Sequence, residues 1–353
     1  MSGSKPTVSV VIPTFNRCDL LKEALDSVRG QTWPDWEAVV VDDGSTDDTL
    51  NLLAEYQRID SRIRFLKRDR LPKGACTCRN IGLAAATGNY VVFLDSDDLL
   101  ALTCLERRVN IFKGDGEYDC IVFQGLLFYK KANDSRRLWN RETDEPDLAR
   151  FLRGDAVWQT SGPIWKMDAV RKLGGFDENL RCWQDVDIHL RTLLHGLKCF
   201  KRLGLAPDYF VRRHQVTSIS QKGFKTREMV ESLFAVFEKT AKLLGPSHRP
   251  DTKSGLRYML AHAVQYALDN RYFDLARKGI ASGMNKGILR EPHSSVWKLA
   301  YAGYAVHSRG VRGCARLGQS LLKPYQPKSF VGVHELPGDQ RKEPVASECH
   351  YHP

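Results

Sequence analysis

The chain has 353 residues, of which 42% are apolar and 27% are charged, and its formal net charge is +11. These values are ordinary for a globular protein and exclude a low-complexity or collagen-like chain. No stretch reaches the roughly 18 to 20 apolar residues of a membrane-spanning helix, and no signal peptide is visible. Nine cysteines without paired zinc-type spacing favour reduced thiols, so we expect a cytoplasmic protein, soluble or peripheral to a membrane.

The first hundred residues alternate between short apolar runs and segments with helical spacing of apolar residues. Helices are predicted near residues 20–28, 49–57 and 80–86. The predicted strands are Val8–Ile12, Trp36–Val41, Ile63–Leu66 and Tyr90–Leu94. This alternation predicts an α/β fold with a mostly parallel, Rossmann-like central sheet and helices on both faces.

The pattern changes after Leu100. Strands are predicted at Cys120–Tyr129 and Phe210–His214, with a helix at Val186–Leu194 between them. From about Lys225 the chain reads as helical to about Leu322. We therefore predict three parts, namely a catalytic domain at 1–224, a helical C-terminal region at 225–325 and a polar, disordered tail at 326–353.

Polar clusters follow three of the predicted strands, after Ile12, Val41 and Leu94. Because ligands of such sheets bind at the carboxyl ends of the strands, the three clusters are expected to line one crevice. The third cluster contains Asp95 and Asp97, whose i, i+2 spacing points both carboxylates the same way on an extended chain. Two such carboxylates suit Mg²⁺ or Mn²⁺ bridging a nucleotide diphosphate, although acid pairs are also common in turns and helix caps.

Four segments together resemble the family 2 glycosyltransferases, which have the GT-A fold. The resemblance extends from Thr7 to Ser220, and its matching segments are VSVVIPTFNR (8–17), SVRGQTWPDWEAVVVDDGSTDDT (27–49), KGACTCRNIGLAAATGNYVVFLDSDD (73–98) and GGFDENLRCWQDVDIHLRTLLHG (174–196). This resemblance implies a hexosyl transfer from a nucleotide sugar, with UDP as the expected nucleotide. It also implies a Mn²⁺ or Mg²⁺ cofactor and inversion at the anomeric carbon.

The resemblance also assigns roles to individual residues around the donor. Residues implied to bind the donor nucleotide are Pro13, Thr14, Asn16, Arg17, Asp42, Arg79 and Asp95. Asp42 is expected to accept a hydrogen bond from the base or ribose, whereas Asp43 is expected to shape the turn. Asp97 is implied as the direct metal ligand, His214 lies near the metal and diphosphate by the same resemblance, and Asp98 is a less certain third acid.

An inverting transfer also needs a base that removes the proton of the acceptor hydroxyl. The family takes this base from a Glu-Asp pair that opens a helix after a Gly-Gly-Phe-Asp turn, and here the pair is Gln184-Asp185. Asp185 is therefore the predicted base, and Asp187 is the alternative. Neutral Gln184 is expected to leave Asp185 less repelled and hence less basic. The resemblance further places Trp158–Trp165 near donor sugar and acceptor, although both tryptophans could equally belong to the core.

Other function classes remain to be weighed. A nicotinamide-dependent dehydrogenase needs G-x-G-x-x-G after its first strand, and Pro13-Thr14-Phe15-Asn16 contains no glycine. The alternative to an enzyme is a non-catalytic nucleotide- or membrane-binding module with a GT-A fold. The expected partners are a nucleotide sugar and a saccharide or lipid-linked acceptor in polysaccharide or cell-envelope synthesis, and nucleic acid is not expected.

The basic C-terminal region is the remaining feature of the sequence. Between Gly245 and Phe330 there are fourteen Lys or Arg and four Asp or Glu, a surplus of ten positive charges. This surplus, mixed with aromatic residues in Ser295–Leu322, predicts attachment to the anionic inner face of the plasma membrane. The alternative is a helical bundle with a solvated basic face.

Overall fold

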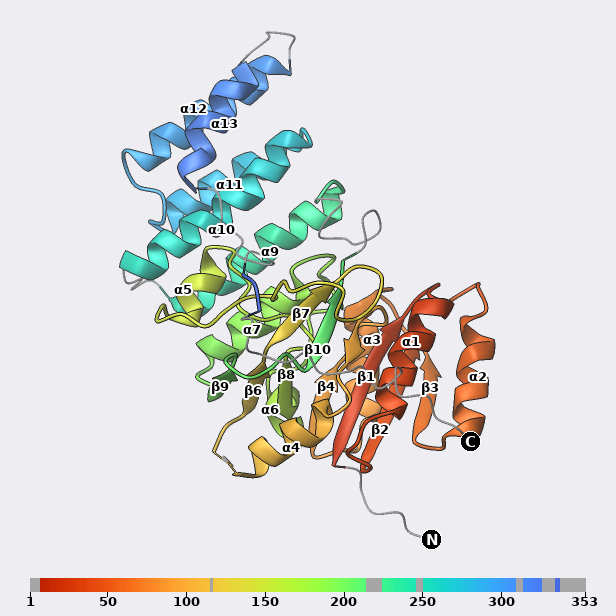
Figure 1. Ribbon diagram of the computed structural model, residues 1–353. Helices are drawn as coiled ribbons and strands as arrows, with labels where there is room; N and C mark the ends of the chain where they lie inside the picture. Colours follow the sequence, from red (N-terminus) through yellow and green to blue (C-terminus); the bar gives the residue numbers. More distant parts are fainter. Residues whose placement is uncertain are drawn as a thin grey trace.

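The structure is a computed structural model that describes residues 7–114, 117–213, 224–245, 250–308, 314–325 and 334–336. A sheet-containing part holds the N-terminal half of the chain, and a stack of helices formed by the C-terminal region rises from one end of it (Figure 1). The fold class predicted from the sequence is confirmed.

The central sheet has seven strands. Their order across the sheet is β3 (Ile63–Lys67), β2 (Trp36–Asp42), β1 (Val8–Thr14), β4 (Tyr90–Phe93), β8 (Pro163–Lys166), β6 (Cys120–Phe123) and β9 (Cys199–Arg202). The first four strands are parallel, whereas β8 runs antiparallel to both of its neighbours. Because β1 lies between β2 and β4, the loops after these three strands meet at one edge.

Helices cover both faces of this sheet because the side chains of a strand alternate between the faces. Val8, Val10 and Ile12 of β1 pack in one core cluster with α1, α2 and α4, whereas Val11 packs in another with α3 and α7. The helices before residue 225 are α1 (Cys18–Arg29), α2 (Thr49–Ile59), α3 (Ala75–Ala85), α4 (Cys104–Gly114), α5 (Asp147–Leu152), α6 (Met167–Lys172) and α7 (Gln184–Leu194).

The single strand predicted at Cys120–Tyr129 is two strands in different sheets. β6 ends at Phe123, and β7 (Gly125–Phe128) joins β5 (Leu99–Leu100) and β10 (Tyr209–Arg212) in a second sheet of order β5-β10-β7. The break follows from packing, since a Cβ atom on Gly125 would lie 2.4 Å from the ring of Tyr209. Only glycine therefore fits where the chain changes sheets.

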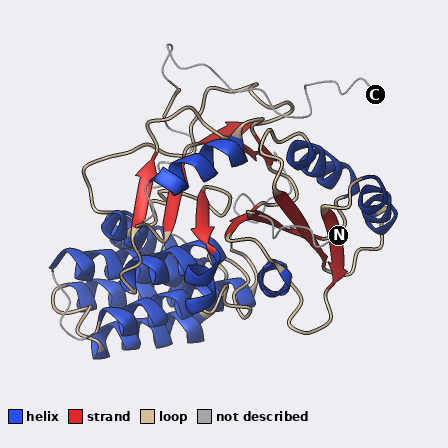
Figure 2. Cartoon of the chain, turned by 90° about the horizontal axis from the view of Figure 1, so that it is seen from below, coloured by secondary structure: helices blue, strands red, loops and turns tan. Residues whose placement is uncertain are grey.

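The C-terminal region consists of helices, as predicted. They are α9 (Arg227–Leu244), α10 (Pro250–Asp269), α11 (Phe273–Asn285), α12 (His293–His307) and α13 (Cys314–Leu322), and they stack beside the sheets (Figure 2). A short 3₁₀ turn at Lys323–Tyr325 follows. α10 packs closely on α5, where a Cβ on Gly255 would lie 2.5 Å from Leu152. One core cluster runs from Val11 of β1 to Trp297 of α12, so the two regions share a core.

Two predictions about the C-terminal part of the chain can be compared with the structure at a few residues. Trp297 and Tyr304, counted among the membrane-facing aromatics, are buried within the helical stack. Within the tail predicted to be disordered, residues 334–336 are described, and Glu335 forms an antiparallel bridge with Arg137 while Leu336 is buried. No helix in the described ranges combines the length and apolarity needed to cross a membrane.

Candidate active site

A cleft of about 710 Å³ opens at the edge where the loops after β1, β2 and β4 meet. The beginnings of α3 and α7 form further parts of its wall, and α10 reaches it from the C-terminal region. Three loops that the sequence predicted to share a crevice do share one, because their strands are adjacent and parallel.

The two carboxylates after β4 face this cleft, and each one is paired with an arginine. Asp95 accepts a hydrogen bond from Arg79 at 2.5 Å, and Asp97 pairs with Arg17 at 2.7 Å. Arg79 is buried and also donates to Gln184 at 3.1 Å, so it joins the acidic loop to the start of α7. The two arginines thus neutralise part of the negative charge of Asp95 and Asp97.

Of the four residues predicted to bind the nucleotide after β1, three line the cleft. Pro13, Thr14 and Arg17 line the cleft, together with the exposed ring of Phe15. Asn16 is not among the lining residues. The backbone N–H of Asn16 donates to the hydroxyl of Ser45, and its side-chain oxygen accepts from the backbone N–H of Thr46. Asn16 therefore connects the loops after β1 and β2.

The structure exchanges the expected positions of Asp42 and Asp43. Asp42 is buried, and its carboxylate accepts hydrogen bonds from the amides of Gly44 and Ser45, which forms the turn after β2. Asp43 lines the cleft and pairs with Arg68 at 2.5 Å. Because the amides of Gly44 and Ser45 donate to Asp42, this residue shapes the turn as was expected of Asp43, while its contact with a base or ribose stays a prediction.

Asp98, the less certain third acid, is held by the protein. Its carboxylate accepts from the amide of Arg212 at 3.0 Å and from the side chain of Gln159 at 3.1 Å. Burial, with the charges of Asp97 and Asp95, raises the pKa of Asp98 well above its usual value. The carboxyl group therefore connects the β4 loop to β10 and to the segment before β8.

The predicted base, Asp185, lines the cleft in the first turn of α7. Burial raises the pKa of its carboxyl group, although the amide of Val186, which donates to it at 2.9 Å, and the charge of Arg79 oppose this change. The preceding Gln184 is fixed at both ends of its amide, because its oxygen accepts from Arg79 and its nitrogen donates to the carbonyl of Leu180 at 3.0 Å. Burial is therefore the largest cause of the raised pKa of Asp185, and neutral Gln184 adds no charge beside it.

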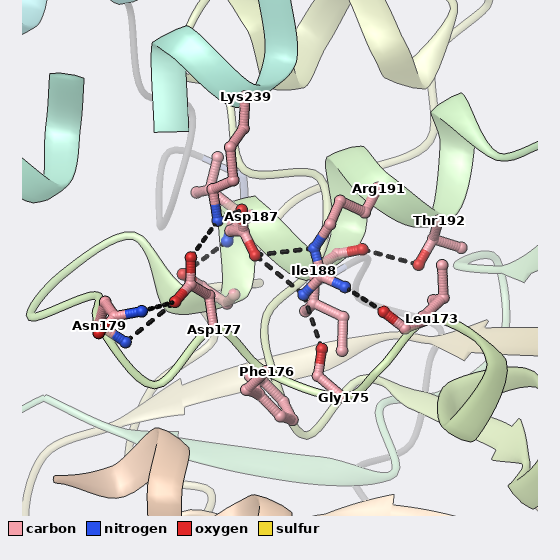
Figure 3. Close-up of polar contacts among 12 residues, drawn as sticks. Leu173, Gly175, Phe176, Asp177, Asn179, Asp187, Ile188, Arg191, Thr192 and Lys239 are labelled. Carbon is pink, nitrogen blue, oxygen red and sulfur yellow. Dashed lines mark hydrogen bonds and ion pairs between the residues drawn. The ribbon is translucent and has the colours of Figure 1, made fainter. Parts of the chain in front are cut away.

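Asp187, the alternative base, is buried and belongs to an ion-pair network with Arg191 and partly exposed Lys239 (Figure 3). Its two carboxylate oxygens pair with Arg191 at 2.9 Å and with Lys239 of α9 at 2.5 Å. Lys239 also pairs with Asp177 of the Gly-Gly-Phe-Asp turn at 2.5 Å. This network fixes α7 to α9 and to the turn, and Asp187 is not among the residues that line the cleft.

Several cleft residues were not singled out by the sequence. They are Trp139, Trp183, Phe224, His262 and Tyr266, with Arg212 and Arg213 at the end of β10. By contrast, Trp158 and Trp165 are buried in the core and flank His189, whose pKa burial lowers to about 3. No sequence pattern marked His262 and Tyr266, because they lie on a helix some 80 residues after Asp185 and their spacing fits any amphipathic helix.

The residues implied to hold a metal are Asp97 and His214, with Asp95 close to Asp97 in the chain. His214 lies outside the described residues. Within the described residues, no group of three or more His, Cys, Asp or Glu side chains is arranged to hold a metal. Asp95 and Asp97 both line the cleft, and two carboxylate donors completed by diphosphate oxygens and water fit a hard divalent cation.

Comparison with known sequences gives a consistent result. A sequence profile described as "Glycosyl transferase family 2" matches residues 9–168. A Bacillus subtilis protein assigned to teichuronic acid biosynthesis as the glycosyltransferase TuaG is 41% identical over 227 residues, which are 64% of this chain and 87% of that protein. A Campylobacter jejuni protein, GalNAc(5)-diNAcBac-PP-undecaprenol beta-1,3-glucosyltransferase, is 37% identical over 37% of this chain and 41% of its own length.

Solved structures show the same fold. Residues 1–349 of TarS from S. aureus, crystallised with UDP-GlcNAc, superimpose with a TM-score of 0.64 at 16% identity, covering 90% of this chain and 91% of that one. The mannosyltransferase PcManGT from Pyrobaculum calidifontis, in complex with GDP-Man and Mn²⁺, gives a TM-score of 0.52 at 18% identity and covers 91% of this chain and 86% of that one. The superposition with TarS extends through most of the chain and therefore beyond the residues matched by the profile.

Proposed function

Because this chain belongs to glycosyl transferase family 2 and is a glycosyltransferase, we propose that it moves a hexosyl group from a UDP-sugar to a hydroxyl of a saccharide or lipid-linked acceptor. The observation that carries the proposal is the meeting of Asp95, Asp97 and Asp185 in one cleft, with buried Arg79 bound to both sides. A donor diphosphate and an acceptor hydroxyl need just such an anion-binding centre beside a carboxylate base.

The nucleoside binds among the loops after β1 and β2. Pro13, Thr14 and Phe15 provide the apolar wall, and Asp43 provides an acceptor-only carboxylate for an imide N–H or a ribose hydroxyl. Asp43 takes the role that the sequence had given to Asp42. Arg17 and Arg79, which pair with the two aspartates after β4, are the cations that bind the diphosphate.

A divalent cation, Mn²⁺ or Mg²⁺, would be held by Asp97, with Asp95 and His214 as further donors. It would supply positive charge to the diphosphate oxygens and so make the nucleotide a better leaving group. The support for this part is the donor chemistry of the acid pair, together with the Mn²⁺ in the complex of PcManGT.

Asp185 accepts the proton of the acceptor hydroxyl. The freed oxygen forms a bond to the anomeric carbon while the bond from that carbon to the diphosphate oxygen breaks, and the diphosphate leaves with the electron pair. Because attack and departure occur on opposite faces, the anomeric configuration is inverted. The raised pKa of the Asp185 carboxyl group supports this role, since a stronger base accepts the proton more readily.

The products proposed for this enzyme are cell-envelope polysaccharides or glycans, since TuaG is assigned to teichuronic acid synthesis and the Campylobacter relative is named for an undecaprenol-linked acceptor. We place the protein in the cytoplasm, peripheral to the inner face of the plasma membrane. Exposed Leu299, Val306 and Leu317 on α12 and α13, with exposed Lys298 and Arg316, support contact with an anionic lipid surface.

Donor hydrolysis tests the proposal without knowledge of the acceptor. The purified protein is incubated with a panel of UDP- and GDP-sugars, with and without Mn²⁺, and free nucleotide diphosphate is measured. We expect metal-dependent release from one UDP-sugar, and thermal stabilisation by UDP plus Mn²⁺ but not by NAD or RNA. Stabilisation without hydrolysis or transfer of any donor would favour the non-catalytic module instead.

A further inference from the structure

Four aromatic side chains form one side of the cleft, and we call them the aromatic wall: Trp183, Phe224, His262 and Tyr266. Trp183 directly precedes Gln184 and Asp185, whereas His262 and Tyr266 lie one turn apart on α10. All four are partly buried, so each ring has one part in the protein and another at the cleft. The wall therefore joins the start of α7 to the C-terminal helices.

The rings of the wall contact one another in a fixed arrangement. Trp183 and His262 are stacked with centroids 5.1 Å apart and an interplanar angle of 13°. Tyr266 meets His262 edge to face at 5.0 Å, and Phe224 contacts both of these rings. Because the rings pack on one another, their side chains lose little conformational entropy when a ligand binds to them.

The backbone of Trp183 adds an independent observation. Its φ angle is +55°, in the left-handed region that bulky residues rarely adopt. The conformation lets its carbonyl accept the first helical hydrogen bond of α7, from the amide of Asp187 at 2.9 Å. A strained backbone of this kind persists only where surrounding contacts enforce it, and it is concentrated at functional sites.

The aromatic wall and the diphosphate-binding centre both adjoin the start of α7, whose first turn carries Asp185. A continuous series of contacts leads from Asp95 through Arg79 and Gln184 to Trp183, and from there to His262. The diphosphate-binding centre consists of arginine–aspartate pairs. The aromatic wall instead presents aromatic rings, a hydroxyl group and an imidazole. Burial lowers the pKa of His262 to about 4, so its ring is neutral at pH 7 and can hydrogen-bond without adding charge.

We infer that the aromatic wall is the binding subsite for a neutral pyranose ring of the acceptor, which stacks on the rings and offers its hydroxyl to Asp185. A pyranose has apolar C–H faces that suit aromatic rings, and an equatorial rim of hydroxyls that suits Tyr266 and His262. The inference rests on the proposed glycosyl transfer and deepens it, because it assigns recognition of the acceptor to the C-terminal helical region.

Saturation-transfer NMR tests the subsite with defined probes, namely methyl β-glucopyranoside, methyl β-galactopyranoside and methyl N-acetyl-β-glucosaminide. Each is measured with and without UDP and Mn²⁺, on the full-length protein. We expect saturation of the ring C–H protons of at least one probe, reduced at least fivefold by His262→Ala and by Tyr266→Ala. Tyr266→Phe keeps the ring and should retain at least half of the signal.

The controls separate binding from folding and from donor recognition. Tyr258→Ala removes a partly buried aromatic from the same helix but away from the cleft, and it should leave the probe signal unchanged. UDP affinity of every variant should stay within twofold of the parent protein, which shows that the cleft is intact. If the parent protein does not bind UDP, this result counts against the proposed function. The measurements without UDP still test the subsite in that case.

Three results would overturn the inference. The first is that no probe receives saturation although the parent protein binds UDP. The second is that a probe binds but His262→Ala and Tyr266→Ala bind it as well as the parent protein. The third is a joint loss of probe binding, UDP affinity and stability. If both variants lose UDP affinity and thermal stability together with the probe signal, the wall is only a packing contact between α7 and α10.

Discussion

The two sides of the cleft are built from different parts of the chain and from different interactions. The nucleotide side consists of loops that follow β1, β2 and β4, and its contacts are pairs between arginine and aspartate. The helical side consists of α7 and α10 and presents aromatic rings, and the buried carboxylate of Asp187 on α7 pairs with Lys239 of α9. Charge thus lies where a diphosphate is proposed to bind, and apolar surface lies where a sugar is proposed to bind.

Figure 3 shows how the second side is kept in place although it is made of elements far apart in sequence. Arg191 pairs with Asp187 and donates to the carbonyls of Leu173 and Gly175, so the turn before α7 is fixed to the helix itself. Lys239 brings α9 into the same network. The nucleotide side needs no such support, because adjacent strands already fix its loops. The comparison therefore predicts different effects on the two sides.

The largest effect is expected at the boundary between the sides. Asp185→Asn keeps the shape of the side chain but removes the proton acceptor, so the turnover number should fall by about two orders of magnitude or more. UDP-sugar affinity should change by less than about threefold, because Asp185 makes no contact with the nucleotide loops in our proposal. Single-turnover kinetics and calorimetry measure the two quantities. Asp187→Asn is the matched control, and a larger loss of turnover there would show that the base is misassigned.

The second-largest effect is expected from replacing Lys239, which pairs with Asp187. Lys239→Met leaves Asp187 with one cation instead of two, and the loss of one partner of the buried Asp187 carboxylate should lower the free energy of unfolding by about 2 kcal/mol. Chemical denaturation measures this change. Lys242→Met, at an exposed position of the same helix, should change it by no more than about 0.5 kcal/mol. Equal effects of the two substitutions would contradict the structural role of the network.

A smaller effect is expected on the nucleotide side. Asp97→Asn removes the charge that we propose binds the metal, and UDP affinity in the presence of Mn²⁺ should fall at least tenfold, or about 1.4 kcal/mol. Affinity for UDP without metal should stay the same or rise, since Arg17 is then released from Asp97. Isothermal titration in both conditions tests this. Unchanged metal-dependent affinity would remove Asp97 from the metal site.

The pH dependence of transfer distinguishes the base from the other carboxylates. Asp185 acts only when ionised, and its pKa is raised, so activity should fall as the pH drops through that raised value. The acidic limb of kcat/KM should therefore lie above about pH 3.9, the pKa of an unperturbed aspartate. Asp187→Asn should leave the limb in place. A limb at or below the unperturbed value would argue that Asp185 does not titrate in catalysis.

The smallest effect concerns the outer surface of the helical region. Replacing exposed Leu299 and Leu317 by serine should weaken binding to vesicles with anionic lipid by about fivefold, because partial burial of two leucines contributes on the order of 1 kcal/mol. Co-sedimentation at low and high salt measures this, and added salt should weaken binding of the parent protein as well. Leu243→Ser on α9 is the control. If the parent protein stays in the supernatant at low salt, the basic residues form only a solvated face.

Prediction from the sequence was correct where it depended on patterns of residues close together in the chain. Alternating apolar runs identified β1 to β4, and the adjacency of parallel strands then placed Arg17, Asp95 and Asp97 at one edge. It did not show that Asp43 rather than Asp42 lines the cleft, since which of two neighbouring carboxylates faces the cleft depends on the hydrogen bonds of the turn. It also failed at Gly125, where contact with the ring of Tyr209 divides one apolar run between two sheets.

The sequence alone was enough to predict the family, the α/β fold with its helical C-terminal region, and the position of Arg17, Asp95 and Asp97 at one edge of the sheet, because each of these depends on residues close together in the chain. Only the tertiary structure decided that Asp187 is buried in an ion-pair network, and that His262 and Tyr266 reach the cleft. The physical reason is that these features arise where α7 packs against α9 and α10. The spacing of residues along one helix indicates which face is apolar, but not which distant element that face will meet.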